Sequence, residues 1–320
     1  MQQVAQRPPA TECWLQGIWA SIPTPFHDDG RLDEAAVRHN AVHFSDALGL
    51  AGVFCNGVMG EGWSLTVEER KDVVRLTLSA SQGRLKVAPV VTAGSLRDSI
   101  SLAQHAETAG AHHIVLAPPP GLYDEAELLR YIDRIAKSVS LPIMLLEATS
   151  GGFGARFLER AAAECDSISG IKIGSGNRTA LDFHNSFGDS LTITDPIEEN
   201  WLSNLQHGLM QTLYADPEPY LFQSGKRRPI EEYFQAHQSG LEERASAISA
   251  ELSGLRALYS RTIIGPMQGG KNPVPALKTW CEFTDLIVGP PRLPLKRLDD
   301  GAQEDIGRRI SSLHKETGIT

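Results

Sequence analysis

Eight short apolar runs, rich in β-branched residues, alternate along the chain with longer amphipathic segments. This alternation is typical of parallel strands joined by crossover helices. The runs cover residues 17–26, 51–57, 86–94, 112–119, 141–148, 169–174, 190–195 and 208–216. Because these runs are nearly continuously apolar, we expect strands that are covered on both faces. The pattern predicts an α/β chain with a parallel sheet.

Eight strand and helix repeats within about 200 residues fit a closed (β/α)8 TIM barrel. A doubly wound open sheet is the alternative, but no run is followed by the glycine pattern of a dinucleotide site or by a P-loop. Helices are predicted at 32–48, 66–81 and 124–139, and Thr66 with Glu69 has the spacing of a capping box. We expect the barrel to cover residues 15–217.

The pattern becomes helical after the last apolar run. Apolar residues at helical spacing cover 230–263, 272–283 and 302–317. The segment 289–295 is too rich in proline for a helix and is expected to be a connector. We predict a C-terminal helical region over residues 218–320 that packs on the barrel.

Composition narrows the class of partner. The chain has 30 Lys and Arg against 39 Asp and Glu, a formal charge of −9, so it has little with which to neutralise a phosphate backbone. No apolar run reaches the ~18 to 20 residues of a membrane span, and the first residues lack the features of a signal peptide. The cysteines have neither disulfide nor metal spacing and are Cys13, Cys55, Cys165 and Cys281. We expect a cytoplasmic protein for a small molecule, without nucleic acid, membrane, metal or organic cofactor.

A lysine lies inside the sixth apolar run. Lys172 is flanked by Ile171 and Ile173. In a desolvated interior the pKa of an ammonium group is lowered, and the neutral amine can attack a carbonyl carbon. From the strand alone, a lysine that snorkels to solvent or pairs with a carboxylate is an equal alternative.

A glycine-rich segment follows the second run. Gly57, Gly60 and Gly62 permit a tight loop whose N–H groups could bind a carboxylate, and a plain glycine turn is the alternative. We expect Glu61 to anchor this loop through hydrogen bonds.

Three motifs, in this order and spacing, resemble those of the dihydrodipicolinate synthase and N-acetylneuraminate lyase family of Schiff-base aldolases. They are SIPTPFHDDGRLDE at 21–34, GVMGEGWSLTVEER at 57–70 and SGIKIGSGN at 169–177. Segments 273–278 and 290–298 are similar to the C-terminal region of that family. The resemblance implies a (β/α)8 barrel, a homo-oligomer that is a tetramer or dimer, and an imine between Lys172 and pyruvate or a related 2-oxo acid.

The resemblance also implies how the substrate carboxylate is held. The family's GTTGE loop corresponds to residues 57–61, so Gly57, Val58 and Met59 would bind the carboxylate through main-chain amides. Both threonine hydroxyls of the family motif are absent. Together with Leu146, the residues Val58 and Met59 indicate a less hydrophilic pocket than a sialic acid requires.

The fifth run departs from the family pattern. Leu146 stands where the family has a proton-relay tyrosine, Glu147 replaces the following asparagine and Thr149 replaces a proline. The loop 118–125 lacks the family's paired tyrosines, and the stretch 150–152 lacks the arginine that binds a second carboxylate in dihydrodipicolinate synthase. We therefore do not expect the lysine-pathway synthase activity.

The missing tyrosine leaves the proton donor and acceptor open. Glu147 is the first candidate because it adjoins Leu146, although successive strand side chains point to opposite faces. The other candidates at strand ends are Asp195, Tyr214, Asp216 and Tyr123. We also expect Tyr214 to line the substrate site. His112 and His113 are expected to be structural.

An iminium at Lys172 would act as an electron sink, which permits aldol cleavage, aldol addition or loss of a C4 hydroxyl. We predict a carbon-carbon or carbon-oxygen lyase that acts on a 2-oxo acid. A sugar-acid dehydratase of the same family is one alternative, because some dehydratase branches also lack the tyrosine. A non-catalytic barrel that binds a 2-oxo acid is the other.

Overall fold

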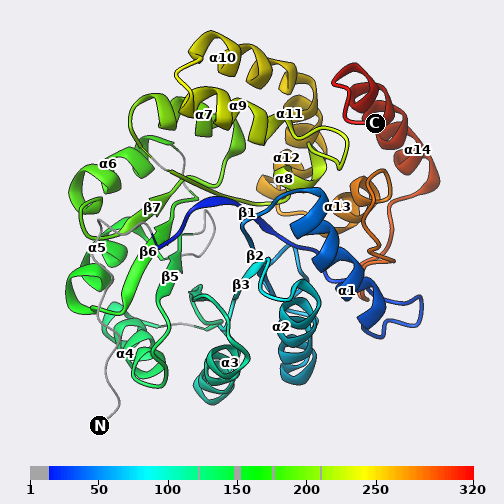
Figure 1. Cartoon of the computed structure of the whole chain (residues 1–320). Coiled ribbons are helices and arrows are strands. Elements are labelled where there is room, and N and C mark those ends of the chain that lie inside the picture. The colour runs from blue at the N-terminus through cyan, green and yellow to red at the C-terminus, as the bar shows by residue number, and fades with distance from the viewer. Residues whose placement is uncertain (1–13, 122, 148–152, 175–176, 210) are drawn as a thin grey trace.

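The computed structural model describes residues 14–320 except 122, 148–152, 175–176 and 210. Strands lie at the centre of the molecule and helices surround them (Figure 1). The strands are β1 (Gly17–Ser21), β2 (Gly52–Cys55), β3 (Lys86–Pro89), β4 (Ile114–Leu116), β5 (Ile143–Leu146), β6 (Ile168–Lys172), β7 (Thr192–Thr194) and β8 (Thr212–Ala215). The intervening helices are α1 (Glu34–Val42), the π-helical turn η1 (His43–Ala47), α2 (Val67–Ser81), α3 (Leu96–Ala109), α4 (Glu125–Ala136), α5 (Ala155–Glu164), α6 (Asn177–Phe187) and α7 (Glu198–Gln206).

The strands pair in parallel in two groups, β3-β2-β1-β8 and β4-β5-β6-β7. A parallel bridge between Val90 and Val115 joins the ends of β3 and β4, and β7 lies beside β8. The circle of strands is therefore complete. The predicted (β/α)8 barrel is confirmed, and the open-sheet alternative is wrong.

Alternation along each strand produces two cores. Side chains such as Ile171 and Ile173 point outward and pack under the helices. The inward side chains fill the barrel itself, and the buried apolar members are Leu15, Trp19, Phe54, Ala88, Val90, Val115, Met144 and Tyr214. The barrel interior is thus a packed core with its polar groups at the strand ends.

Local signals set the helix starts. Thr66 accepts a hydrogen bond from the N–H of Glu69, whose carboxylate accepts one from the N–H of Thr66, so the predicted capping box is present. Asp124 and Glu127 form the same reciprocal pair before α4. The predicted helix at 32–48 consists of α1 followed by η1.

After β8 the described chain is helical. The elements are α8 (Glu218–Leu221), α9 (Pro229–Gln238), α10 (Glu242–Glu251), α11 (Ser253–Tyr259), the π-helical turn η2 (Ser260–Ile264), α12 (Gly265–Gln268), α13 (Val274–Cys281) and α14 (Asp300–Glu316). The predicted helical stretch 230–263 is therefore divided, and Gly240, with φ of 73°, separates α9 from α10. Helix α13 packs against α14 and η2. None of the helices in the described ranges is long and apolar enough to span a bilayer.

Candidate active site

Lys172 is the last residue of β6 and points into the mouth of the barrel. It is 8% exposed, and it lies in register with Leu146 of β5 and Thr194 of β7. Its neighbours on the strand point the other way into the outer core, as alternation requires. The lysine is thus placed at the carboxyl ends of the strands, where barrel enzymes carry their reactive groups.

Asp216 and Phe54 contact the lysine amine. The Nζ of Lys172 lies 2.6 Å from Oδ1 of Asp216 and 4.5 Å from the centre of the Phe54 ring. Asp216 directly follows β8, where its carbonyl oxygen accepts a hydrogen bond from the N–H of Ser21. Barrel closure therefore brings together two groups that are 44 residues apart in sequence. Asp216 is only a lesser candidate from the sequence, because the sequence does not show that the carboxyl ends of β6 and β8 lie close together.

A second carboxyl group lies close behind Asp216. Glu218, at the start of α8, is 6% exposed, and its Oε2 has no hydrogen-bond partner among the described residues. Burial, together with the negative charge of Asp216, raises the pKa of Glu218 well above its usual value. The charged form of Glu218 is therefore disfavoured beside Asp216. The sequence analysis did not identify it, and its only signal was its spacing of two from Asp216.

The fifth strand places an apolar side chain beside the amine. Leu146 packs against the inner core of the barrel and is the register partner of Lys172, so no β5 hydroxyl faces the amine there. Glu147 is partly buried, and its N–H donates to the carbonyl oxygen of Lys172 at 2.9 Å. Glu147 is therefore a main-chain neighbour of the lysine. Thr149 and the stretch 150–152 lie outside the described residues.

The loop after β2 forms the rim beside this site. A Cβ atom on Gly57 would lie 3.5 Å from Val90 and 3.9 Å from the hydroxyl of Ser21, which places the loop start over the inner face of the barrel. Val58 is 57% exposed, whereas the Met59 side chain is buried. Within the described part of the chain, the N–H groups of Val58 and Met59 donate to no protein acceptor. Two adjacent donors of this kind can bind an anion.

Tyr214 lies deeper than the sequence analysis expected. It is fully buried, its ring stacks on Phe54 with centroids 4.7 Å apart, and its hydroxyl lies 3.1 Å from Nε2 of His113. Burial raises the pKa of Tyr214 well above its usual value and lowers that of His113 well below. Since Phe54 also contacts the Lys172 amine, its ring lies between that amine and the tyrosine. This arrangement belongs to the barrel core.

Asp195, which follows β7, and Tyr123, which precedes α4, are the remaining candidates. Asp195 accepts hydrogen bonds from the N–H of Ile197 and the side chain of Asn200, at 3.0 and 2.9 Å, and so orders the entry to α7. Burial raises the pKa of Asp195. Tyr123 is 49% exposed on the loop before α4. Cys13 lies outside the described residues, and the described ones contain no cluster of three or more His, Cys, Asp or Glu that could hold a metal.

Known proteins resemble this chain over half to nearly all of its length. The 4-hydroxy-tetrahydrodipicolinate synthase of Methanopyrus kandleri is 28% identical over 93% of this chain and 96% of its own. A probable 5-dehydro-4-deoxyglucarate dehydratase of Corynebacterium glutamicum is 34% identical over 50% of this chain and 51% of its own. The solved structure of YagE from E. coli K12, a member of the dihydrodipicolinic acid synthase family in complex with pyruvate, superimposes with a TM-score of 0.78 at 22% identity, covering 95% of this chain and 99% of its own.

A family-level match accompanies these relatives. The model of the dihydrodipicolinate synthetase family matches residues 14–313, which is nearly the whole chain. The relatives named above include a synthase and a dehydratase. The chain belongs to the dihydrodipicolinate synthetase family and is a lyase.

Proposed function

We propose that the chain is a Schiff-base lyase for a 2-oxo acid, with Lys172 as its nucleophile. The observation that supports this most is the placement of a nearly buried amine at the barrel mouth, 2.6 Å from the Asp216 carboxylate. The anion-binding donors on the loop after β2 supply a second group that such a substrate requires. A fold relative was solved in complex with pyruvate, the simplest 2-oxo acid of this kind.

In the proposed mechanism, Asp216 moves the proton that imine formation requires. The carboxylate accepts a proton from the Lys172 ammonium, and the free amine attacks the C2 carbonyl to form a carbinolamine. The protonated Asp216 then returns its proton to the C2 hydroxyl, which leaves as water and yields the iminium. The N–H groups of Val58 and Met59 hold the substrate carboxylate throughout.

The iminium then draws electrons away from C3. Cleavage of the C3–C4 bond, with loss of a proton from a C4 hydroxyl, releases an aldehyde and leaves an enamine. Alternatively, loss of a C3 proton followed by departure of the C4 hydroxyl as water gives a dehydrated acid. Glu147 stays a proposed participant in these later proton transfers, because its main chain adjoins that of Lys172.

The dehydratase reaction is the second candidate. It is supported by the 34% identity to a probable 5-dehydro-4-deoxyglucarate dehydratase over half of this chain. The loss of the family's tyrosine at Leu146 agrees with either reaction. We further propose that the protein acts in the cytoplasm as a homodimer or homotetramer, as its resemblance to the family implies.

Borohydride trapping tests the nucleophile directly. Pyruvate and longer 2-oxo acids are incubated with the protein and borohydride, and intact mass and peptide mapping locate the adduct. We expect a reduced adduct on Lys172, lost in Lys172→Ala. In Asp216→Asn the trapping rate should fall by ~100-fold or more, the usual contribution of a positioned proton-transfer group.

The matched variant is Glu147→Gln, which changes the neighbouring carboxylate. If it slows trapping as much as Asp216→Asn does, the assignment of Asp216 fails. An adduct on another lysine would contradict the role of Lys172. Absence of an adduct with every 2-oxo acid would contradict the lyase proposal and leave a barrel that only binds its ligand.

A further inference from the structure

The loop between β2 and α2, residues 56–66, is called the rim loop below. Two of its non-glycine residues adopt a backbone conformation that such residues do not favour. Asn56 and Glu61 have φ of 63° and 53°, in the left-handed region. An added Cβ atom on Gly60 would lie 2.9 Å from the main-chain oxygen of Ile22, and one on Gly62 would lie 1.9 Å from that of Asn56. The loop therefore packs tightly on the segment after β1 and on its own backbone. Such backbone persists only where its surroundings hold it. Whatever holds Glu61 therefore determines where the Val58 and Met59 amides point.

Glu61 is held by the C-terminal region. Its side chain is fully buried, with Oε1 2.7 Å from Nζ of Lys278, and its Oε2 accepts a hydrogen bond from the N–H of Arg292 at 2.9 Å. Lys278 also donates to the carbonyl oxygen of Thr24 at 2.9 Å, and the Thr24 hydroxyl donates to the carbonyl oxygen of Gly60 at 2.6 Å. These contacts hold the loop at two adjacent residues of its turn, Gly60 and Glu61.

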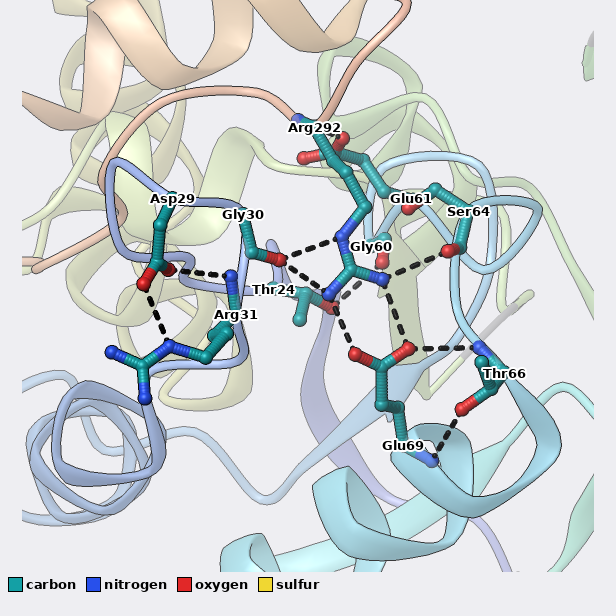
Figure 2. Close-up of polar contacts among 10 residues, drawn as sticks. All are labelled: Thr24, Asp29, Gly30, Arg31, Gly60, Glu61, Ser64, Thr66, Glu69 and Arg292. Atoms are coloured by element: carbon teal, nitrogen blue, oxygen red, sulfur yellow. Dashed lines mark hydrogen bonds and ion pairs between the residues drawn. The ribbon is translucent and has the colours of Figure 1, made fainter.

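The guanidinium of Arg292 secures the far end of the same loop. It forms a two-pronged ion pair with Glu69 at the start of α2, at 2.6 and 2.9 Å, and donates to the carbonyl oxygen of Ser64 at 2.8 Å. Two further hydrogen bonds reach the carbonyl oxygen of Gly30, which lies after β1. Figure 2 shows these partners converging on one guanidinium from three separate segments.

An aromatic ring joins the two cations. The Phe26 ring lies 4.5 Å from Nζ of Lys278 and 4.2 Å from Cζ of Arg292, and it is 2% exposed. Both cations therefore have their positions set by the β1 to α1 segment as well as by Glu61. A shift of Lys278 would disturb the loop turn at Glu61. A shift of Arg292 would disturb the end of the loop at Ser64 and the first turn of α2 at Glu69.

We infer that the guanidinium of Arg292 positions the main-chain amides that would bind the substrate carboxylate, those of Val58 and Met59. It acts through Ser64, whose carbonyl oxygen it binds. The N–H of Ser64 donates to the carbonyl oxygen of Glu61, and the N–H of Glu61 donates to that of Val58, at 2.7 and 3.1 Å. The inference rests on the proposed function, and it assigns part of the substrate affinity to the segment after α13. Arg292 lies at the opposite end of the loop from the lysine amine. It should therefore affect how tightly the 2-oxo acid is held, with little effect on how fast the bound acid forms the imine.

The test separates these two quantities. The rate of borohydride trapping is measured against pyruvate concentration for the full-length protein and for Arg292→Met. We expect the half-saturating pyruvate concentration to rise about tenfold, the size of effect that misplaced binding groups produce, while the maximal trapping rate stays within about twofold of the parent. Arg292→Lys keeps the cation over Phe26 and should recover part of the lost affinity.

Arg256→Met is the matched control. Arg256 also forms a two-pronged ion pair, with Glu198 at 2.8 and 2.9 Å, and donates to the carbonyl oxygen of Ser249, but it touches no part of the rim loop. Arg256→Met should reduce thermal stability without changing the half-saturating pyruvate concentration. If Arg292→Met does not fold, Arg292→Lys carries the same comparison.

The outcomes are distinct. An unchanged half-saturating concentration in the Arg292 variants, or an equal rise in Arg256→Met, would overturn the inference while the lyase proposal stands. A parent protein that no 2-oxo acid labels would instead overturn the proposed function. A fall in the maximal trapping rate alone would contradict the positioning role, since it would indicate damage at the amine.

Discussion

Removing Lys278 should expose the energetic cost of the buried pair under the rim loop. Lys278→Met leaves the Glu61 carboxylate, 0% exposed, with only the N–H of Arg292 as a partner among the contacts described above. Breaking a buried ion pair by removing one member costs about 3 to 5 kcal/mol. Burial lowers the pKa of Lys278, with the Glu61 carboxylate only partly opposing that shift. The cost of Lys278→Met comes mainly from the Glu61 charge, which stays buried without its partner.

Two further variants complete the comparison: Glu61→Gln, and the double variant that combines Glu61→Gln with Lys278→Met. Glu61→Gln leaves the Lys278 ammonium buried with carbonyl partners only, and we expect a similar loss of about 3 to 5 kcal/mol. The double variant buries no charge at this place, and the methionine can contact the Phe26 ring through its sulfur. Its loss should be smaller than the sum of the single losses by about 2 to 3 kcal/mol.

The assay is urea unfolding followed by far-ultraviolet circular dichroism and tryptophan fluorescence. The slope of free energy against urea concentration should stay constant across the four proteins, so that differences in midpoint report stability. The reasoning is refuted if the two single losses add to within about 0.5 kcal/mol of the double variant. Additivity would mean that the two side chains do not depend on each other.

Two further predictions concern groups inside the barrel. Tyr214→Phe removes the hydroxyl bonded to His113 and should lower the free energy of unfolding by about 1 to 3 kcal/mol. The rate of borohydride trapping at Lys172 should remain unchanged. Slower trapping would place the hydroxyl in the active site. Burial lowers the pKa of His112 to about 4 from 6.5. Between these two values the unfolded chain binds more protons than the folded one. The melting temperature should therefore drop as the pH falls from 6.5 to 4. His112→Phe should show a shallower drop, and a curve of equal steepness would contradict the assignment.

Local patterns in the sequence predict most of the fold. Apolar runs predict the strands because each strand is buried on both faces, and the Thr66 and Glu69 pair predicts a helix start because its hydrogen bonds span only three residues. The division of 230–263 was missed, since an apolar helical spacing continues across breaks such as that at Gly240.

The active site depended on contacts between distant segments. The apolar neighbours of Lys172 leave a reactive amine and a paired lysine as equal alternatives, and the family resemblance favours the amine. The contact with Asp216 arises only when β6 and β8 close the same barrel. Likewise, Glu61 and Lys278 are separated by most of the chain, so no local pattern could pair them. The sequence also does not show that Tyr214 is fully buried, because a residue's position in a strand does not reveal which layer of the barrel interior it occupies.

The stacked rings of Phe54 and Tyr214 also bear on the order of chemical events at Lys172. They close the barrel directly beneath the amine, so a reactant approaches it from the mouth. In the proposed mechanism, a 2-oxo acid bound to Lys172 as an iminium would occupy that approach, and a second reactant would have to arrive over it. A released fragment must depart by the same opening before water can enter to free the amine. For an aldol reaction, this single route predicts an ordered sequence in which the 2-oxo acid is the first molecule in and the last molecule out.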